Sequence, residues 1–101
     1  MYYYSVTVSI EQDCAQEWLT WMTAVHIPEV MATGLFNSYR MLRVTEPVVE
    51  LDAVTYNIQY AFDDLQALEA YRQHHAPALQ AAHSERYRDR FVAFRTVLQE
   101  V

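Results

Sequence analysis

Histidines are the residues of this chain best suited to proton transfer near neutral pH. His26, His75 and His83 fall on the apolar arcs of two predicted helices, whereas His74 falls on an exposed side. A histidine among apolar side chains can act as a general base, because its unperturbed pKa of about 6.5 lies near working pH. His26 is the first candidate, since it lies near the middle of its arc and should point toward the predicted sheet. The alternative is a neutral core histidine whose ring nitrogens bond to a tyrosine hydroxyl or a backbone carbonyl.

A carboxylate and a set of aromatic side chains accompany His26. Glu29 is either an orienting partner for His26 or a carboxylate at a helix N-terminus, where the helix dipole is worth roughly 0.3–1 kcal/mol. A small-ligand pocket is the first interpretation of the aromatic, histidine and methionine side chains on the inner faces, and a plain aromatic core is the second. The pocket would be lined by Trp18, Trp21, Met22, His26, Tyr56, Tyr60, His75 and His83, with Tyr4 beside them.

Metal and cofactor chemistry finds little support. His75 and His83 are eight residues apart, or about 12 Å along an unbroken helix, so they cannot share a metal ion on their own. The chain has no lysine for a Schiff base, and its single glycine, Gly34, leaves no Gly-rich phosphate loop. We therefore predict neither a metal nor a cofactor.

Composition restricts the class of protein. The chain has 101 residues, 52% of them hydrophobic, and a net charge of -6, which suits a single domain with a packed core. The negative charge argues against nucleic-acid binding, because phosphates attract basic surfaces. No apolar run reaches the roughly 18–20 residues of a membrane span, the start lacks a basic signal region, and Cys14 is the only cysteine. These features predict a cytoplasmic protein without membrane partners.

Hydrophobic periodicity predicts four strands and two helices. Residues 2–10 and 54–62 alternate apolar and polar side chains, as half-buried strands do, whereas 35–45 and 91–99 are apolar on both faces. The first helix follows Asp13 as its expected N-cap, and its apolar arc holds Ala15, Trp18, Leu19, Trp21, Met22 and Val25. The second follows Asp63 or Asp64, and its apolar face holds Leu65, Leu68, Tyr71, Leu79 and Ala82. Residues 46–52, with Pro47, form the expected turn between halves.

A short motif occurs twice, as HIPEV at 26–30 and HAPAL at 75–79. Proline is unfavourable inside a helix, so each motif should begin a new helical turn after a kink. Aligning the two motifs also pairs residues 36–42 with 91–97. The sequence thus predicts two related halves, about 1–45 and 53–101, within one domain.

The order strand, helix, strand, strand, helix, strand predicts an α+β, ferredoxin-like βαββαβ fold, in which a four-stranded antiparallel sheet carries two kinked helices on one face. The opposite face should pack on the same face of a second copy, because its side chains are polar but uncharged. An ordinary solvated face, rich in threonine for strand propensity, is the alternative. Arg40 and Arg95 would lie on outer strands in matching positions, where they either pair with carboxylates at the dimer edge or bind an anion. The polar face would consist of Ser5, Thr7, Ser9, Thr55, Asn57 and Gln59.

Three stretches that cover nearly the whole chain resemble a known family. They are YYYSVTVSI, WLTWMTAVHIPEVMATGLF and HHAPALQAAHSERYRDRFVAFRTVL. They are similar to small bacterial proteins of the domain-of-unknown-function family DUF4286. The resemblance implies a dimeric α+β barrel, as in antibiotic-biosynthesis monooxygenases and EthD-like proteins, with a ligand cleft between helices and sheet. It does not imply one chemistry.

Two functions remain open at this point. The chain is either a small homodimeric barrel that binds a small apolar or aromatic ligand between helices and sheet, or a cofactor-independent monooxygenase or isomerase of the same type with His26 as general base. A cleft of about 300 Å³ or more beside His26 would favour the enzyme. A dry, filled core there would exclude it.

Overall fold

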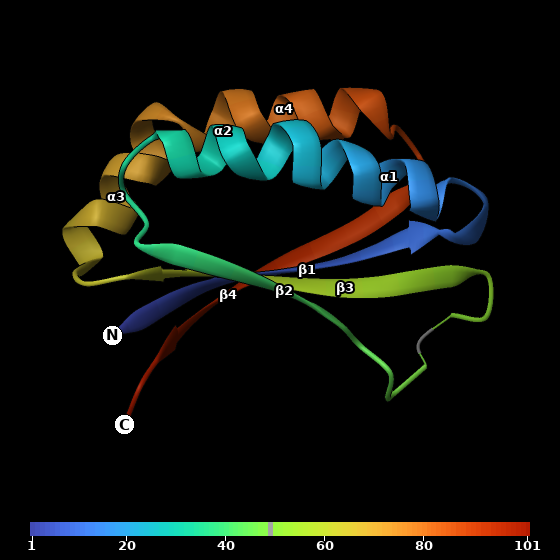
Figure 1. Ribbon diagram of the computed structural model, residues 1–101, viewed down its shortest axis with the longest axis horizontal. Helices are drawn as coiled ribbons and strands as arrows, with labels where there is room; N and C mark the ends of the chain where they lie inside the picture. Colours follow the sequence, from blue (N-terminus) through green and yellow to red (C-terminus); the bar gives the residue numbers. More distant parts are fainter. Residues whose placement is uncertain (49) are drawn as a thin grey trace.

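The computed structural model describes residues 1–48 and 50–101. All four strands pair antiparallel in the order β2-β3-β1-β4, and the helices lie together on one face of the sheet (Figure 1). This is the α+β, ferredoxin-like arrangement that the order of elements predicts. The elements are β1 (Tyr2–Glu11), η1 (Gln12–Cys14), α1 (Ala15–Trp21), η2 (Met22–His26), α2 (Ile27–Ala32), β2 (Ser38–Arg43), β3 (Ala53–Phe62), α3 (Leu65–His74), α4 (Ala76–Arg86) and β4 (Phe91–Gln99).

The two helical arms begin in different ways. The Asp64 side chain caps α3 by accepting a hydrogen bond from the backbone N–H of Ala67 at 3.1 Å, as one of the two predicted caps should. The prediction that Asp13 caps α1 is wrong, because α1 follows the 3₁₀ turn η1 without a side-chain cap. The Asp13 carboxylate instead lies 2.5 Å from the Arg90 guanidinium. Asp13 therefore pairs with Arg90, which is distant in sequence, and not with the backbone N–H groups of the first helical turn.

Both prolines lie in the first turn of a new helical segment, as the repeated motif predicts, but at its second position and not at the predicted first. Pro28 follows Ile27 in α2, and Pro77 follows Ala76 in α4. In the first arm the helix continues through the π-helical turn η2, where the N–H of Ile27 bonds to the carbonyl of Met22, five residues back. In the second arm the helix breaks instead. A proline lacks the N–H that the carbonyl four residues earlier needs, so the preceding turn must widen or break.

The π-helical turn also changes which side chains face the sheet. A wider turn delays the helical phase, so Val25 is 39% exposed although regular α-helical spacing places it on the apolar arc. The predictions for Leu65 and Ala82 are likewise wrong, since both are exposed at the outer sides of α3 and α4. Ile27 and Val30 are buried in their place.

Strand pairing separates the sheet into two faces of different chemistry. The helix-facing side carries Val6, Ile58 and Arg95, which lie opposite one another in the register. The predicted equivalence of residues 36–42 with 91–97 fails here, because Arg40 lies opposite Gln59 on the other face. Side chains alternate between the two faces of a strand, so an alignment that is wrong by one residue assigns a side chain to the wrong face. The strand predicted over 35–45 is also shorter, since β2 spans Ser38–Arg43. The predicted turn over 46–52 includes Val49, which lies outside the described residues.

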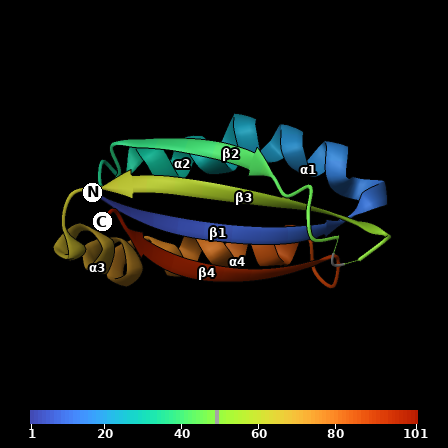
Figure 2. The same cartoon turned by 90° about the horizontal axis from the view of Figure 1, so that it is seen from below.

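The core fills the space between the helices and the helix-facing side of the sheet. Its largest fully buried side chains are Trp18, Phe62, Ile10, Ile27, Ile58, Leu68 and Val30. The opposite face of the sheet carries no helix, as the view from below shows (Figure 2). Among the described helices, none is both long enough and apolar enough to cross a membrane.

Candidate functional site

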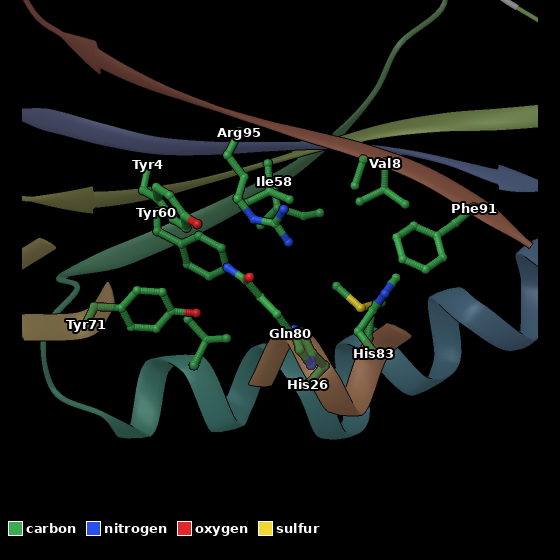
Figure 3. A pocket seen from close by; sticks show the side chains of 14 residues that line it. Tyr4, Val8, His26, Ile58, Tyr60, Tyr71, Gln80, His83, Phe91 and Arg95 are labelled. Carbon is green, nitrogen blue, oxygen red and sulfur yellow. The ribbon is translucent and has the colours of Figure 1, made fainter. Parts of the chain in front are cut away.

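A cavity of about 40 Å³ lies inside the core between the helices and the sheet (Figure 3). Its polar lining comes from Tyr4, His26, Tyr60, Tyr71, Gln80, His83 and Arg95. Its apolar lining comes from Val6, Val8, Met22, Val30, Ile58, Phe91 and Ala93. A water needs at least about 10–15 Å³ of such space, so the cavity holds roughly three waters or one small polar group. It is much smaller than the cleft of about 300 Å³ that would favour an enzyme.

The structure separates the eight predicted pocket residues into two groups. On the cavity wall lie Met22, His26, Tyr60 and His83, with Tyr4 beside them. Four residues do not line the cavity, and some of them pack against residues that do. They are Trp18, Trp21, Tyr56 and His75. The periodicity of the helices indicates which side chains point inward, but it cannot tell those that reach a cavity from those that fill the layer behind it.

Trp18 holds His83 in one tautomer. The Trp18 indole Nε1–H donates a hydrogen bond to His83 Nε2 at 2.9 Å, and both residues are buried. The Nε2 atom of His83 must therefore carry the lone pair, and its ring proton sits on Nδ1. Trp18 itself stacks on Tyr56 with ring centroids 5.2 Å apart. Two of the predicted pocket residues thus position a third.

His26 is a half-buried imidazole on the cavity wall. Its ring lies 5.0 Å from the Trp21 ring and 5.8 Å from the His83 ring, centroid to centroid. Its buried Nδ1 has no hydrogen-bond partner among the described residues. Burial, with a smaller contribution from the Arg95 charge, lowers the pKa of His26 to about 4. His26 is therefore neutral at pH 7, and the same shift makes it a weaker base than an imidazole with the unperturbed pKa of about 6.5 that is assumed from the sequence alone.

The second buried histidine has the same charge state. Burial, followed by the neighbouring His26 and then Arg95, lowers the pKa of His83 to about 4. Neither imidazole carries a positive charge at pH 7. Arg95 is therefore the cation among the side chains that line the cavity.

Two predicted residues lie away from this wall. Glu29 is exposed in the first turn of α2, the place that a carboxylate near a helix N-terminus takes. His75 is the residue at the break before α4, and its ring stacks on Tyr71 with centroids 6.4 Å apart. The break turns His75 out of line with His83, although both fall on one arc of a continuous helical wheel.

Sequence reasoning missed Tyr71, Gln80 and Arg95 as wall residues. The sequence predicts Arg95 at the dimer edge or at an anion site, and in the structure it extends from β4 toward the helices, while Gln80 extends from α4 toward the sheet (Figure 3). A signal was available, since Phe91, Ala93 and Arg95 share one face of a period-two strand. For Gln80 no comparable signal exists, because a glutamine on a helix is ordinarily solvated.

The described part of the chain holds no group of three or more histidine, cysteine, aspartate or glutamate side chains placed to share a metal ion. Cys14 also differs from a reactive thiol, since burial raises its pKa.

Comparison with known proteins identifies both a family and a fold. A family model described as "Domain of unknown function (DUF4286)" matches residues 1–101. An ethyl tert-butyl ether D (EthD) family protein from Bacillus halodurans is similar in structure, with a TM-score of 0.69 and 14% identity over 100% of both chains. SnoaB, a cofactor-independent oxygenase from Streptomyces nogalater, gives a TM-score of 0.67 at 13% identity, over 98% of this chain and 92% of the other.

A third solved structure has the same fold. It is a dimeric ferredoxin-like protein from an uncultured marine organism, with a TM-score of 0.60 and 15% identity over 99% of this chain and 98% of the other. Identities this low show a shared fold and leave the chemistry to be argued from the site. No curated protein matches the sequence.

Proposed function

The chain belongs to the DUF4286 family, whose description assigns no activity, and from its site we propose that it is a homodimeric protein that binds a small organic ligand between its helices and sheet. The cavity of about 40 Å³ would take one small group of the ligand. The apolar or aromatic remainder would lie in the mouth, where Arg95 is exposed and Gln80 is half-buried.

The observation that carries this proposal is a set of polar side chains with no partner in the fold. Within residues 1–48 and 50–101, no protein hydrogen bond is made by the side chains of Tyr60, Tyr71, Gln80 or Arg95, although all four line one cavity. On the same wall His26 Nδ1 is buried and has no partner in the described ranges, and leaving a buried polar atom unpaired costs roughly 1–3 kcal/mol. A cavity lined by this atom and by four side chains that the fold does not use can pair them with water or with a ligand.

A thermal-shift screen of small aromatic and aliphatic compounds tests the proposal. A ligand at one hundred times its Kd should add about 2.7 kcal/mol to the free energy of unfolding, which gives a shift of several degrees. Ala93→Leu places a larger side chain in the cavity and should abolish the shift. The matched control, Ala81→Leu on the exposed side of α4, should retain it. A shift that survives Ala93→Leu unchanged would place the ligand elsewhere.

The homodimer is supported by apolar side chains on the uncovered face of the sheet. On this face lie Leu42, Val92, Phe94 and Leu98, which are 42%, 68%, 61% and 40% exposed in the single chain. Exposed apolar patches of this kind mark interaction sites in soluble proteins. A second copy that presents the same face would cover them, in the isologous arrangement typical of twofold dimers.

The polar centre of the same face is already paired within the chain. The Asn57 amide donates to the Ser5 and Thr7 hydroxyls at 2.8 Å and 3.0 Å. The Ser9 and Thr55 hydroxyls share a hydrogen bond of 2.8 Å. Because these groups satisfy one another, a second sheet can cover them with a small desolvation cost. This favours the dimer over the solvated face that the sequence left as an alternative.

A second candidate function is cofactor-independent oxygenase or isomerase chemistry with His26 as general base. Its specific support is the imidazole on the cavity wall, which is neutral at pH 7 and has a buried Nδ1 without a partner in the described chain. SnoaB, with the same fold, is described as a cofactor-independent oxygenase.

Exchange of substrate protons tests this second function. With phenylacetone as probe in D₂O, a catalytic His26 should accelerate loss of the C–H signal next to the carbonyl, measured by NMR. His26→Gln should return the rate to that of buffer, and His74→Gln, which alters an exposed histidine, should not. Equal rates in wild type and buffer would contradict general-base catalysis by His26 on this class of substrate.

A further inference from the structure

We propose that the ligand of this cavity carries a carboxylate, held by the Arg95 guanidinium together with the Gln80 amide and the Tyr71 hydroxyl. The inference rests on the proposed function, because it names the chemical class of the ligand at the same site.

The charge of the lining is the first argument. The chain is acidic, with 13 aspartate and glutamate residues against 7 arginines. The cavity wall nevertheless contains one arginine and no acidic residue. Arg95 is thus the one cation on a wall of apolar and neutral groups, and no carboxylate on that wall competes with an anionic ligand for its guanidinium.

Arg95 also differs from the arginines that serve the fold. Arg86 pairs with Glu17, and Arg90 pairs with Glu11 and Asp13, each at 2.5 Å. Arg95 makes no ion pair with any carboxylate in the described ranges. Its charge reaches the cavity groups instead, since it lowers the pKa values of His26 and His83. A guanidinium presents a planar fork of donors that matches the two oxygens of a carboxylate.

Neutral donors complete the recognition. Burial raises the pKa of Tyr71 to about 12, so its hydroxyl keeps its proton at pH 7 and can donate a hydrogen bond to an anion. Tyr71 from α3, Gln80 from α4 and Arg95 from β4 point into the same space between helices and sheet (Figure 3). Both histidines are neutral there, so a single cation faces a single anionic group.

The size of the cavity fits the head group of such a ligand. A carboxylate has three heavy atoms and replaces roughly the three waters that about 40 Å³ can hold. A whole aromatic ring requires more room, since the apolar cavity known to bind benzene measures roughly 150 Å³. The ring or chain of the ligand would therefore remain in the mouth beside Arg95.

NMR titrations with benzoate and benzamide test the charge, because the two compounds have the same shape and differ in the anionic head. Amide signals of the cavity residues are followed in wild type, in Arg95→Gln and in the control Arg88→Gln, which alters an exposed arginine on the turn before β4. We expect benzoate to bind wild type and Arg88→Gln at least tenfold more tightly than benzamide. In Arg95→Gln the difference should fall below twofold, while the melting temperature stays close to that of wild type.

Three other outcomes overturn the inference. If benzamide and benzoate bind wild type alike, the carboxylate is not recognised, although the proposed ligand site stands. If the preference for benzoate survives in Arg95→Gln, another group recognises the anion. If neither compound shifts cavity signals in wild type, and the compound screen gives no cavity ligand, both the inference and the proposed function fail.

Discussion

At the scale of single residues, the site depends on two histidines kept neutral by burial. His83 is fixed by the Trp18 indole, and His26 lies between the Trp21 ring and the cavity. A neutral imidazole in this layer adds no positive charge to repel Arg95. It also leaves the fold sensitive to acid, because protonation would place two like charges with ring centroids 5.8 Å apart beside an arginine.

This arrangement predicts a pH dependence of stability with a defined sign. The pKa values of His26 and His83 are about 4 in the folded chain, below the unfolded value of about 6.5. Between these values the unfolded chain binds more protons. The stability from both groups is therefore present above about pH 6.5 and is lost as pH falls toward 4, by up to about 1.4 kcal/mol per pH unit for each histidine.

Urea unfolding measured across this pH range checks the prediction. His26→Gln removes one of the two groups and should make the loss of stability shallower. His74→Gln removes an exposed histidine and should leave the wild-type slope. Equal slopes in wild type and His26→Gln would show that His26 stays protonatable in the folded chain.

At the scale of elements, the two helical arms respond differently to the same proline position. The first arm widens into η2 and places His26 on the cavity wall, whereas the second breaks at His75 and turns that residue away. The proline of the repeated motif therefore has the same position in both helical segments, but it follows a π-helical turn in the first arm and a break in the second.

The prolines give a second prediction. Pro28→Ala and Pro77→Ala should each lower the free energy of unfolding by about 0.5–1 kcal/mol, since each loses a restriction on the unfolded chain while the first-turn position tolerates alanine. Urea denaturation with a shared m-value measures this effect. A loss above about 2 kcal/mol would mean that the proline ring itself packs in the folded chain.

The elements were predictable from local pattern, and the cavity was not. Some features depend only on neighbours in sequence, and the structure contains them as predicted. They are the strand alternation in residues 2–10 and 54–62 and the helix cap at Asp64. Arg95 and Gln80 line one cavity only because α4 lies against β4, where the His83 and Phe91 rings are 4.4 Å apart, centroid to centroid. The exposure of Val25 depends on a π-helical turn that regular spacing cannot represent.

At the scale of the whole molecule, the sheet separates the two proposed sites. Its helix-facing side forms the candidate ligand site, and its uncovered side is the proposed dimer interface (Figures 1 and 2). Because the two lie on opposite faces, substitutions at the interface should leave the cavity residues in place. Ligand binding and dimerisation can therefore be tested with separate variants.

Sedimentation equilibrium at micromolar concentration gives the third prediction. The wild-type chain should have about twice its mass of 11.9 kDa. Phe94→Lys, at a position already 61% exposed in the single chain, should split the dimer without unfolding the protomer, because an unpaired buried charge costs several kcal/mol. Thr7→Lys should act in the same way, whereas Thr20→Lys on the exposed side of α1 should remain dimeric. A monomeric wild type would contradict the proposed interface.

A crystal structure of the wild-type chain, grown with the most stabilising compound from the thermal-shift screen, would show whether the cavity beside His26 and Arg95 is a ligand site. We expect electron density for that compound between the helices and the sheet, in contact with Arg95 and with its polar group inside the cavity. Density for the compound on the uncovered face of the sheet, with the space beside His26 closed by protein side chains, would contradict it.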